Sequence, residues 1–98
     1  MIEITCKVDE QITLAIRGHA ETASPEHPNI ICAAVSTLFC TLVNALDAYG
    51  IPAEVRMEPG DSKVQCGNTP QARACMDFAM IGLTGVAQAH SENIQITL

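Results

Sequence analysis

The chain has 98 residues, the length of one small domain, and we expect a single domain over residues 1–98. Hydrophobic residues make up 48% of it and charged residues 16%, which is typical of a folded protein. The formal charge is −6, with only five Lys and Arg. This charge argues against direct nucleic-acid binding, which depends on basic side chains, and favours a basic partner.

Five cysteines, at positions 6, 32, 40, 66 and 75, are an odd number, and no secretory signal precedes them. We therefore expect thiols in the reducing cytoplasm rather than a disulfide framework. No two cysteines form a CxxC pair, and the three histidines are widely scattered. The spacing predicts neither a metal site nor a bound cofactor.

An uncharged stretch covers residues 30–46, whose seventeen residues are at the lower limit for a membrane span. Polar residues interrupt it and no basic flank follows, which favours a buried helix and no membrane contact. The interrupting residues are Ser36, Thr37, Thr41 and Asn44.

The first half of the chain is predicted to form a hairpin and a helix. Apolar and polar residues alternate over residues 2–8 and again over 12–17, which indicates two strands joined by a tight turn at Asp9 and Glu10. A helix from about residue 31 to residue 49 follows, with one broad apolar face, and Gly50 closes it.

The second half of the chain is predicted to form another hairpin, another helix and one last strand. Segments 53–58 and 62–66 alternate on either side of Pro59-Gly60-Asp61, and Thr69-Pro70 opens a helix with apolar residues at helical spacing. Residues 93–98 form the last strand. The order ββαββαβ predicts a two-layer α+β fold, with a mixed or antiparallel sheet and two helices packed on one face.

Among the five cysteines, Cys32 has a different position in the predicted helices and strands from the others. Cys6, Cys66 and Cys75 are in phase with apolar residues and are expected to be buried, and Cys40 is expected to be partly exposed. Cys32 stands in the first turn of the first helix, after a candidate cap at Asn29. Unpaired N–H groups and the helix dipole favour a thiolate there.

His19 ends the second strand, and residues 20–29 have the composition of a loop that would bring this strand end close to Cys32. A histidine there could take the proton of Cys32, and amides of the helix's first turn, including that of Ala33, could stabilise an oxyanion. Spacing alone leaves open that His19 merely ends a strand and that Cys32 merely packs.

Around these residues the sequence resembles a known family. Gly18-His19-Ala20, a loop, and then Ile30-Ile31-Cys32-Ala33-Ala34-Val35-Ser36 are similar to the signature of the Prp-type ribosomal-processing cysteine proteases of bacteria. The resemblance implies a Cys32 nucleophile, a His19 general base and a supporting Ser36. It also implies a homodimer and a substrate, the N-terminal extension of the twenty-seventh protein of the large ribosomal subunit.

The chain departs from this family pattern in the loop. Asn29 stands where the family usually has Asp, and the usual glycines are missing. An Asn can still cap the helix and orient an imidazole, but it brings no negative charge. His27 is a rival base, although it stands between prolines, and a base must be held within reach of its proton.

Two non-proteolytic functions remain as alternatives. A ribosome-assembly adaptor would keep the fold and the dimer and only bind the peptide. A thiol redox sensor would need a second cysteine near Cys32, but Cys40 lies two turns along the same predicted helix, about 12 Å away by helix rise. The predicted reaction is therefore acyl transfer by Cys32 and His19.

Overall fold

The computed structural model describes residues 1–19 and 30–98 and confirms the predicted α+β fold in the order ββαββαβ. Every described boundary that the sequence predicted lies within one residue of its expected place. The structure differs from the prediction at Asp61, which the sequence places in the turn but which begins a strand opposite Glu58. The elements are β1 Ile2–Val8, β2 Gln11–Gly18, α1 Ile30–Ala48, β3 Ala53–Glu58, β4 Asp61–Gly67, α2 Pro70–Ala89 and β5 Ile94–Thr97.

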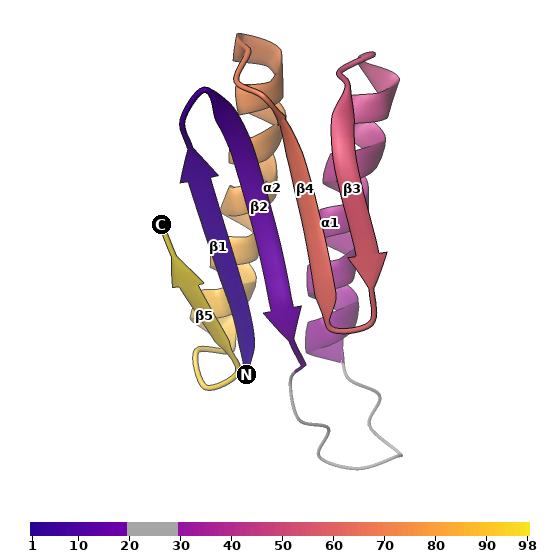
Figure 1. The fold of residues 1–98 in the computed structure, drawn as a ribbon. Coiled ribbons are helices and arrows are strands. Elements are labelled where there is room, and N and C mark those ends of the chain that lie inside the picture. Colours follow the sequence, from indigo (N-terminus) through magenta and orange to yellow (C-terminus); the bar gives the residue numbers. More distant parts are fainter. Residues whose placement is uncertain (20–29) are drawn as a thin grey trace.

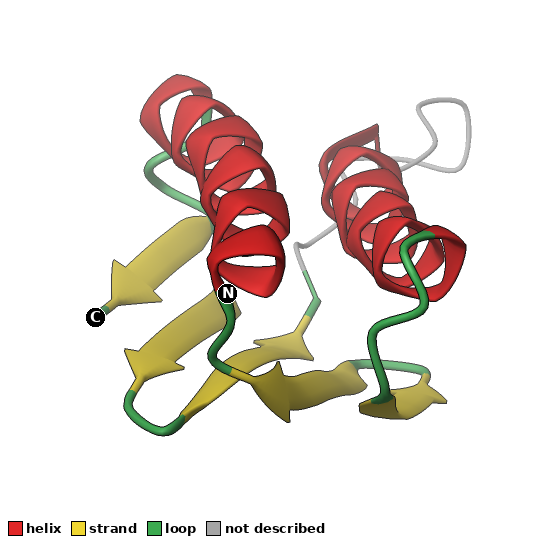
Figure 2. Ribbon diagram, turned by 90° about the horizontal axis from the view of Figure 1, so that it is seen from above, coloured by secondary structure: helices red, strands yellow, loops and turns green. Residues whose placement is uncertain are grey.

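The strands form one mixed sheet in the order β3-β4-β2-β1-β5. All neighbouring strands are antiparallel except β1 and β5, which are parallel. Both helices lie on the same face of the sheet (Figure 1), and the view along the layers shows that the described elements leave the other face uncovered (Figure 2). The central strand is therefore β2, which pairs with β1 on one side and β4 on the other.

The core lies between the sheet and the helices. Alternate residues of β1 and β2 point into it, as the period of two requires, and each helix adds one apolar stripe at helical spacing. The stripe of α1 is Val35, Phe39, Leu42 and Leu46, and that of α2 is Ala72, Met76, Ala79 and Leu83.

The start of α2 and the packing of α1 agree with what their sequences predict. The hydroxyl of Thr69 accepts a hydrogen bond from the N–H of Ala72 at 3.2 Å, so Thr69 caps α2, and Pro70 occupies its first turn. By length and composition alone, α1 could cross a membrane. In the fold, its buried stripe packs against the sheet.

The core and the edge of the sheet offer a matched test of this packing. Met76 is 1% exposed in α2, whereas Met57 is 53% exposed in β3. We expect Met76→Ala to lower the free energy of unfolding by about 2–5 kcal/mol, because it leaves a cavity. Met57→Ala should change it by about 0.5 kcal/mol or less. Urea unfolding of both variants measures the difference, and equal losses would contradict the assigned core.

Candidate active site

The backbone of His19 is anchored at the end of β2 by two neighbouring segments. The N–H of Gly18 donates to the carbonyl of Gly60 at 2.9 Å, and the amino group of Met1 donates to the carbonyl of His19 at 2.8 Å. Gly18 has φ +92°, and a Cβ at this position would overlap the Met1 carbonyl oxygen. Only glycine therefore fits at position 18 without displacing the start of β1.

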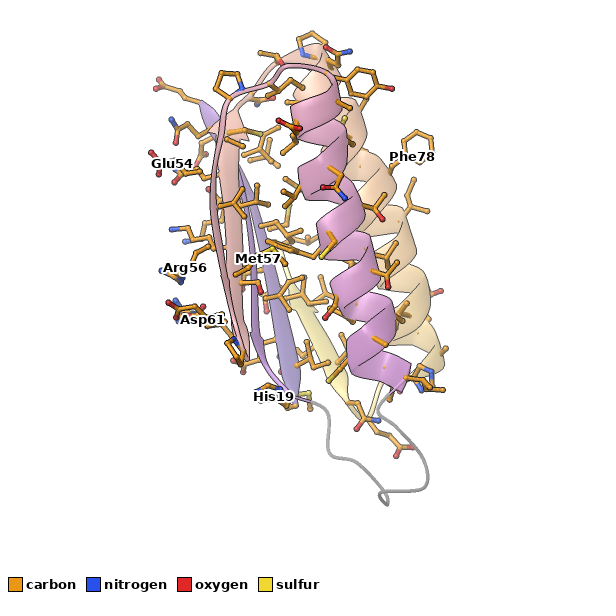
Figure 3. All side chains as sticks on the ribbon, turned by 90° about the vertical axis from the view of Figure 1, so that its right-hand side faces the viewer. His19, Glu54, Arg56, Met57, Asp61 and Phe78 are labelled. Atoms are coloured by element: carbon orange, nitrogen blue, oxygen red, sulfur yellow. The ribbon has the colours of Figure 1, made fainter. Side chains whose placement is uncertain are left out.

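The imidazole of His19 lies against Gly60, in the turn between β3 and β4. A Cβ at Gly60 would overlap Nε2 of the imidazole, and the φ of Gly60 is +71°. Figure 3 shows His19 at this end of the sheet, near Asp61, the residue that follows Gly60. The sequence identified Gly60 only as a turn residue, because its contact with position 19 depends on the pairing of β2 with β4.

Cys32 is the third residue of α1, half-buried, and its side chain packs against the core. It stands in the first turn, where backbone N–H groups lack acceptors within the helix itself. The start of α1 and the end of β2 lie at the same end of the molecule (Figures 1 and 3). The fold thus brings the elements that carry His19 and Cys32 to one end of the two layers.

The other candidates on α1 are Ala33 and Ser36, and both are exposed. The carbonyl of Ala33, which belongs to the peptide group after its N–H, accepts a hydrogen bond from the hydroxyl of Thr37 at 2.8 Å. Asn29, the expected cap, and His27, the rival base, lie outside the described residues.

Three of the remaining cysteines have the expected environments, and Cys75, expected to be buried, is more exposed than predicted. Cys6 and Cys66 are buried, and Cys40 and Cys75 are half-buried. Burial raises the pKa of the Cys6 thiol, an effect that Arg73 opposes and Asp77 reinforces. Burial, with a smaller effect from Cys75, also raises the pKa of the Cys66 thiol. Both buried thiols are therefore held in the protonated, unreactive form.

Two ion pairs lie near the His19 end of the sheet, and Asp61 takes part in both. Its Oδ1 atom lies 3.0 Å from Nη2 of Arg56 and 3.7 Å from Nε of Arg17. These side chains are well exposed, so the ion pairs add little to stability but hold the two guanidinium groups on the open face. Across residues 1–19 and 30–98, no cluster of three or more His, Cys, Asp or Glu side chains could hold a metal ion.

Comparison with protein families gives one match, and a search of curated proteins gives none. The matching family model is described as cysteine protease Prp, and it covers residues 1–95.

Solved structures of about the same length share the fold. An essential ribosomal processing protease Prp from S. aureus, in complex with a covalently linked product peptide, aligns with a TM-score of 0.87 and 20% identity over 99% of this chain and 98% of that one. The same S. aureus protease with a substrate peptide aligns with a TM-score of 0.83 and 19% identity, over the same shares of the two chains. A Streptococcus mutans protein aligns with a TM-score of 0.71 and 23% identity, over 99% of this chain and 92% of that one. At these identities the likeness shows the fold.

Two glycines provide a matched test of the contact between His19 and the β3–β4 turn. Gly50 and Gly60 have φ values of +68° and +71°, but a Cβ at Gly50 meets nothing within 4 Å. Alanine at either position should cost about 1–2 kcal/mol of stability, because both need a left-handed backbone. Only Gly60→Ala should also displace the His19 ring, seen as a shift of its NMR signals. Unchanged ring signals in Gly60→Ala would contradict the contact.

Proposed function

The chain belongs to the family of the cysteine protease Prp, and from this premise we propose that Cys32 is its nucleophile and His19 its general base. The observation that carries the assignment is the placement of both residues at one end of the fold. His19 is anchored there through Gly18 and Gly60, and Cys32 stands in the first turn of α1. Cys32 belongs to α1 and His19 directly follows β2, so each is attached to a regular element, which suits a pair that must keep its geometry.

The proposed chemistry is acyl transfer. His19 takes the proton of the Cys32 thiol or stabilises the thiolate, and Sγ attacks the carbonyl carbon of the scissile peptide bond. The carbonyl electrons move to oxygen, where amides of the first turn of α1, with that of Ala33 among the candidates, stabilise the negative charge. The bond to the leaving amine then breaks, and the amine takes the proton from His19. Water hydrolyses the thioester and restores the Cys32 thiol.

Two further residues have supporting roles in this proposal. Ser36 lies one helical turn after Cys32 on α1, so its hydroxyl is on the same side of the helix as the nucleophile. Asn29 would cap α1 and orient the imidazole in place of the family's usual Asp. An amide can do both without the charge that an aspartate would bring to a protonated imidazole.

The proposed substrate is the N-terminal extension of the twenty-seventh protein of the large ribosomal subunit, cleaved in the cytoplasm. The family and the S. aureus structures, which are named for ribosomal processing and hold peptides, support this choice. The charge of this chain, −6, suits a basic ribosomal protein. Its five cysteines are thiols rather than disulfides, which suits a reducing compartment.

Two cysteines of α1 provide a matched pair for testing the nucleophile. We expect Cys32→Ala to abolish cleavage of the precursor ribosomal protein while leaving the fold intact, because it removes Sγ and little packing. Cys40→Ala, in a half-buried position further along the same helix, should cleave normally. Intact mass spectrometry of the precursor measures both results. Cleavage by Cys32→Ala would refute the assigned nucleophile, whereas binding without cleavage by the unmodified protein would favour the adaptor.

We further propose that the chain is a homodimer formed through the outer surface of its two helices. A groove of about 430 Å³ lies between α1 and α2, and its lining residues are all uncharged and mostly apolar. Phe78 stands at this groove with 80% of its surface exposed (Figure 3), and Ile81 follows on α2 at 71%. An aromatic side chain so exposed is typical of a protein interface.

Two threonine hydroxyls of this surface are already paired within α1. The hydroxyl of Thr41, which lines the groove, donates to the carbonyl of Thr37 at 2.7 Å, and Thr37 donates to Ala33. Covering the groove therefore leaves these hydroxyls paired. In a two-fold dimer the same surface meets itself, so Phe78 of each chain can enter the groove of its partner.

A charge at Phe78 tests this dimer surface. We expect Phe78→Glu to convert the dimer to a monomer, because the carboxylate would be buried without a partner. Leu98→Glu, at an exposed apolar residue outside the groove, should leave the dimer intact. Sedimentation equilibrium measures the mass of each variant. A monomeric unmodified protein, or a Phe78→Glu dimer, would contradict the proposed surface.

A further inference from the structure

The outer edge of β3 is a regular strand edge without a described neighbour. Within the described residues β3 pairs only with β4, and it stands at the end of the sheet order. The register of the two strands runs without a bulge from Ala53, opposite Cys66, to Glu58, opposite Asp61. An unpaired and regular edge of six residues is a template for an additional strand.

The direction of the backbone groups along β3 follows from the turn. The carbonyl of Gly60 accepts from Gly18 in β2, so residues of β4 with even numbers direct their backbone towards β2 and those with odd numbers towards β3. The β3 partners of the odd residues are Glu54, Arg56 and Glu58. The N–H and C=O groups of Ala53, Val55 and Met57 therefore point outwards from the sheet.

The side chains of two of these residues form an exposed apolar strip. Val55 is paired with Val64, which is fully buried under the helices, so Val55 and Met57 project on the helix side of the sheet. Figure 3 shows Met57 between β3 and α1. Val55 is nevertheless 44% exposed and Met57 53%, because β3 has no further strand beside it among residues 1–19 and 30–98. An added strand with apolar side chains at alternate positions would bury both.

The other face of β3 carries two carboxylates and one guanidinium, and Lys63 of β4 is paired with Arg56 on the same face. Glu54, Arg56 and Glu58 project onto the open face of the sheet, where Figure 3 shows the first two. The guanidinium of Arg56 is already bonded to Asp61 at 3.0 Å. Among the described residues, neither Glu54 nor Glu58 has an ion-pair partner. Basic side chains would complement these two carboxylates.

The strand also leads directly to the candidate active site. Glu58 is followed by Pro59 and Gly60, and the imidazole of His19 lies on Gly60. A chain that follows the edge of β3 is therefore directed towards the end of the molecule where His19 and the first turn of α1 lie (Figure 1).

We propose that the outer edge of β3 binds the substrate polypeptide as an added strand, with apolar residues on Val55 and Met57 and basic residues on Glu54 and Glu58. The inference rests on the proposed function, since it names the binding surface of the same protease. Backbone hydrogen bonds supply affinity in this arrangement, and the alternation of side chains supplies selectivity.

The test compares two substitutions at Val55 in the Cys32→Ala protein, so that binding is measured without cleavage. Val55→Pro removes one outward N–H and no bond to β4, whereas Val55→Thr keeps the N–H and nearly the same shape. We expect Val55→Pro to weaken binding of a labelled peptide from the N-terminal extension about fivefold to tenfold. Val55→Thr should change it about twofold or less. Fluorescence anisotropy measures the Kd.

A scan of the peptide keeps the proposal testable if Val55→Pro does not fold. Single N-methylation along the peptide should weaken binding at every second residue, because alternate N–H groups of a paired strand face its neighbour. Equal binding by all methylated peptides, or by both Val55 variants, would overturn the proposal. Loss of the dimer in Val55→Pro would also overturn it, because a second copy would then occupy the edge. Absence of cleavage by the unmodified protein, with the binding pattern intact, would refute the proposed function alone.

Discussion

The pairing of β2 with both of its neighbours is the constraint on which the rest of the structure depends. β2 pairs with β1 from Gly18 to Ile12 and with β4 from Gln11 to Arg17, and its inward residues Ile12 and Leu14 are fully buried. A shift of one residue would turn those side chains to the open face, so the burial of the core determines the register. The same register places Gly18 beside Gly60 and the start of β1, and so decides where His19 stands.

The two halves of the candidate site are held in different ways. The sheet holds His19 through backbone contacts at Gly18 and Gly60, both of which have positive φ. The core holds Cys32, because α1 is packed on the sheet through its stripe from Val35 to Leu46. A reaction that needs a base and a nucleophile in constant geometry would benefit from neighbouring elements that are each held by packing or by strand pairing.

The surfaces proposed for assembly and for substrate do not overlap. The groove at Phe78 is lined by residues of α1 and α2 and by Tyr49. The edge of β3 lies at the margin of the sheet (Figure 1). The hydroxyl of Thr41 is bonded within its own helix, which suits burial against a second copy. Backbone groups of β3 face outwards, which suits an extended chain. A dimer joined through its helices would therefore leave both strand edges open to peptides.

Local sequence determined the elements, because the alternation of apolar residues, the turns at Asp9 and Pro59, and the cap at Thr69 act over a few residues. It also placed Cys32 in a first turn and His19 after a strand, and the family resemblance joined them into a hypothesis. Only the tertiary structure decided the strand order, the parallel pairing of β5 with β1, and the contact of His19 with Gly60. These features join residues far apart in the chain, and no local preference records which strands meet, because the burial of a shared core selects their arrangement.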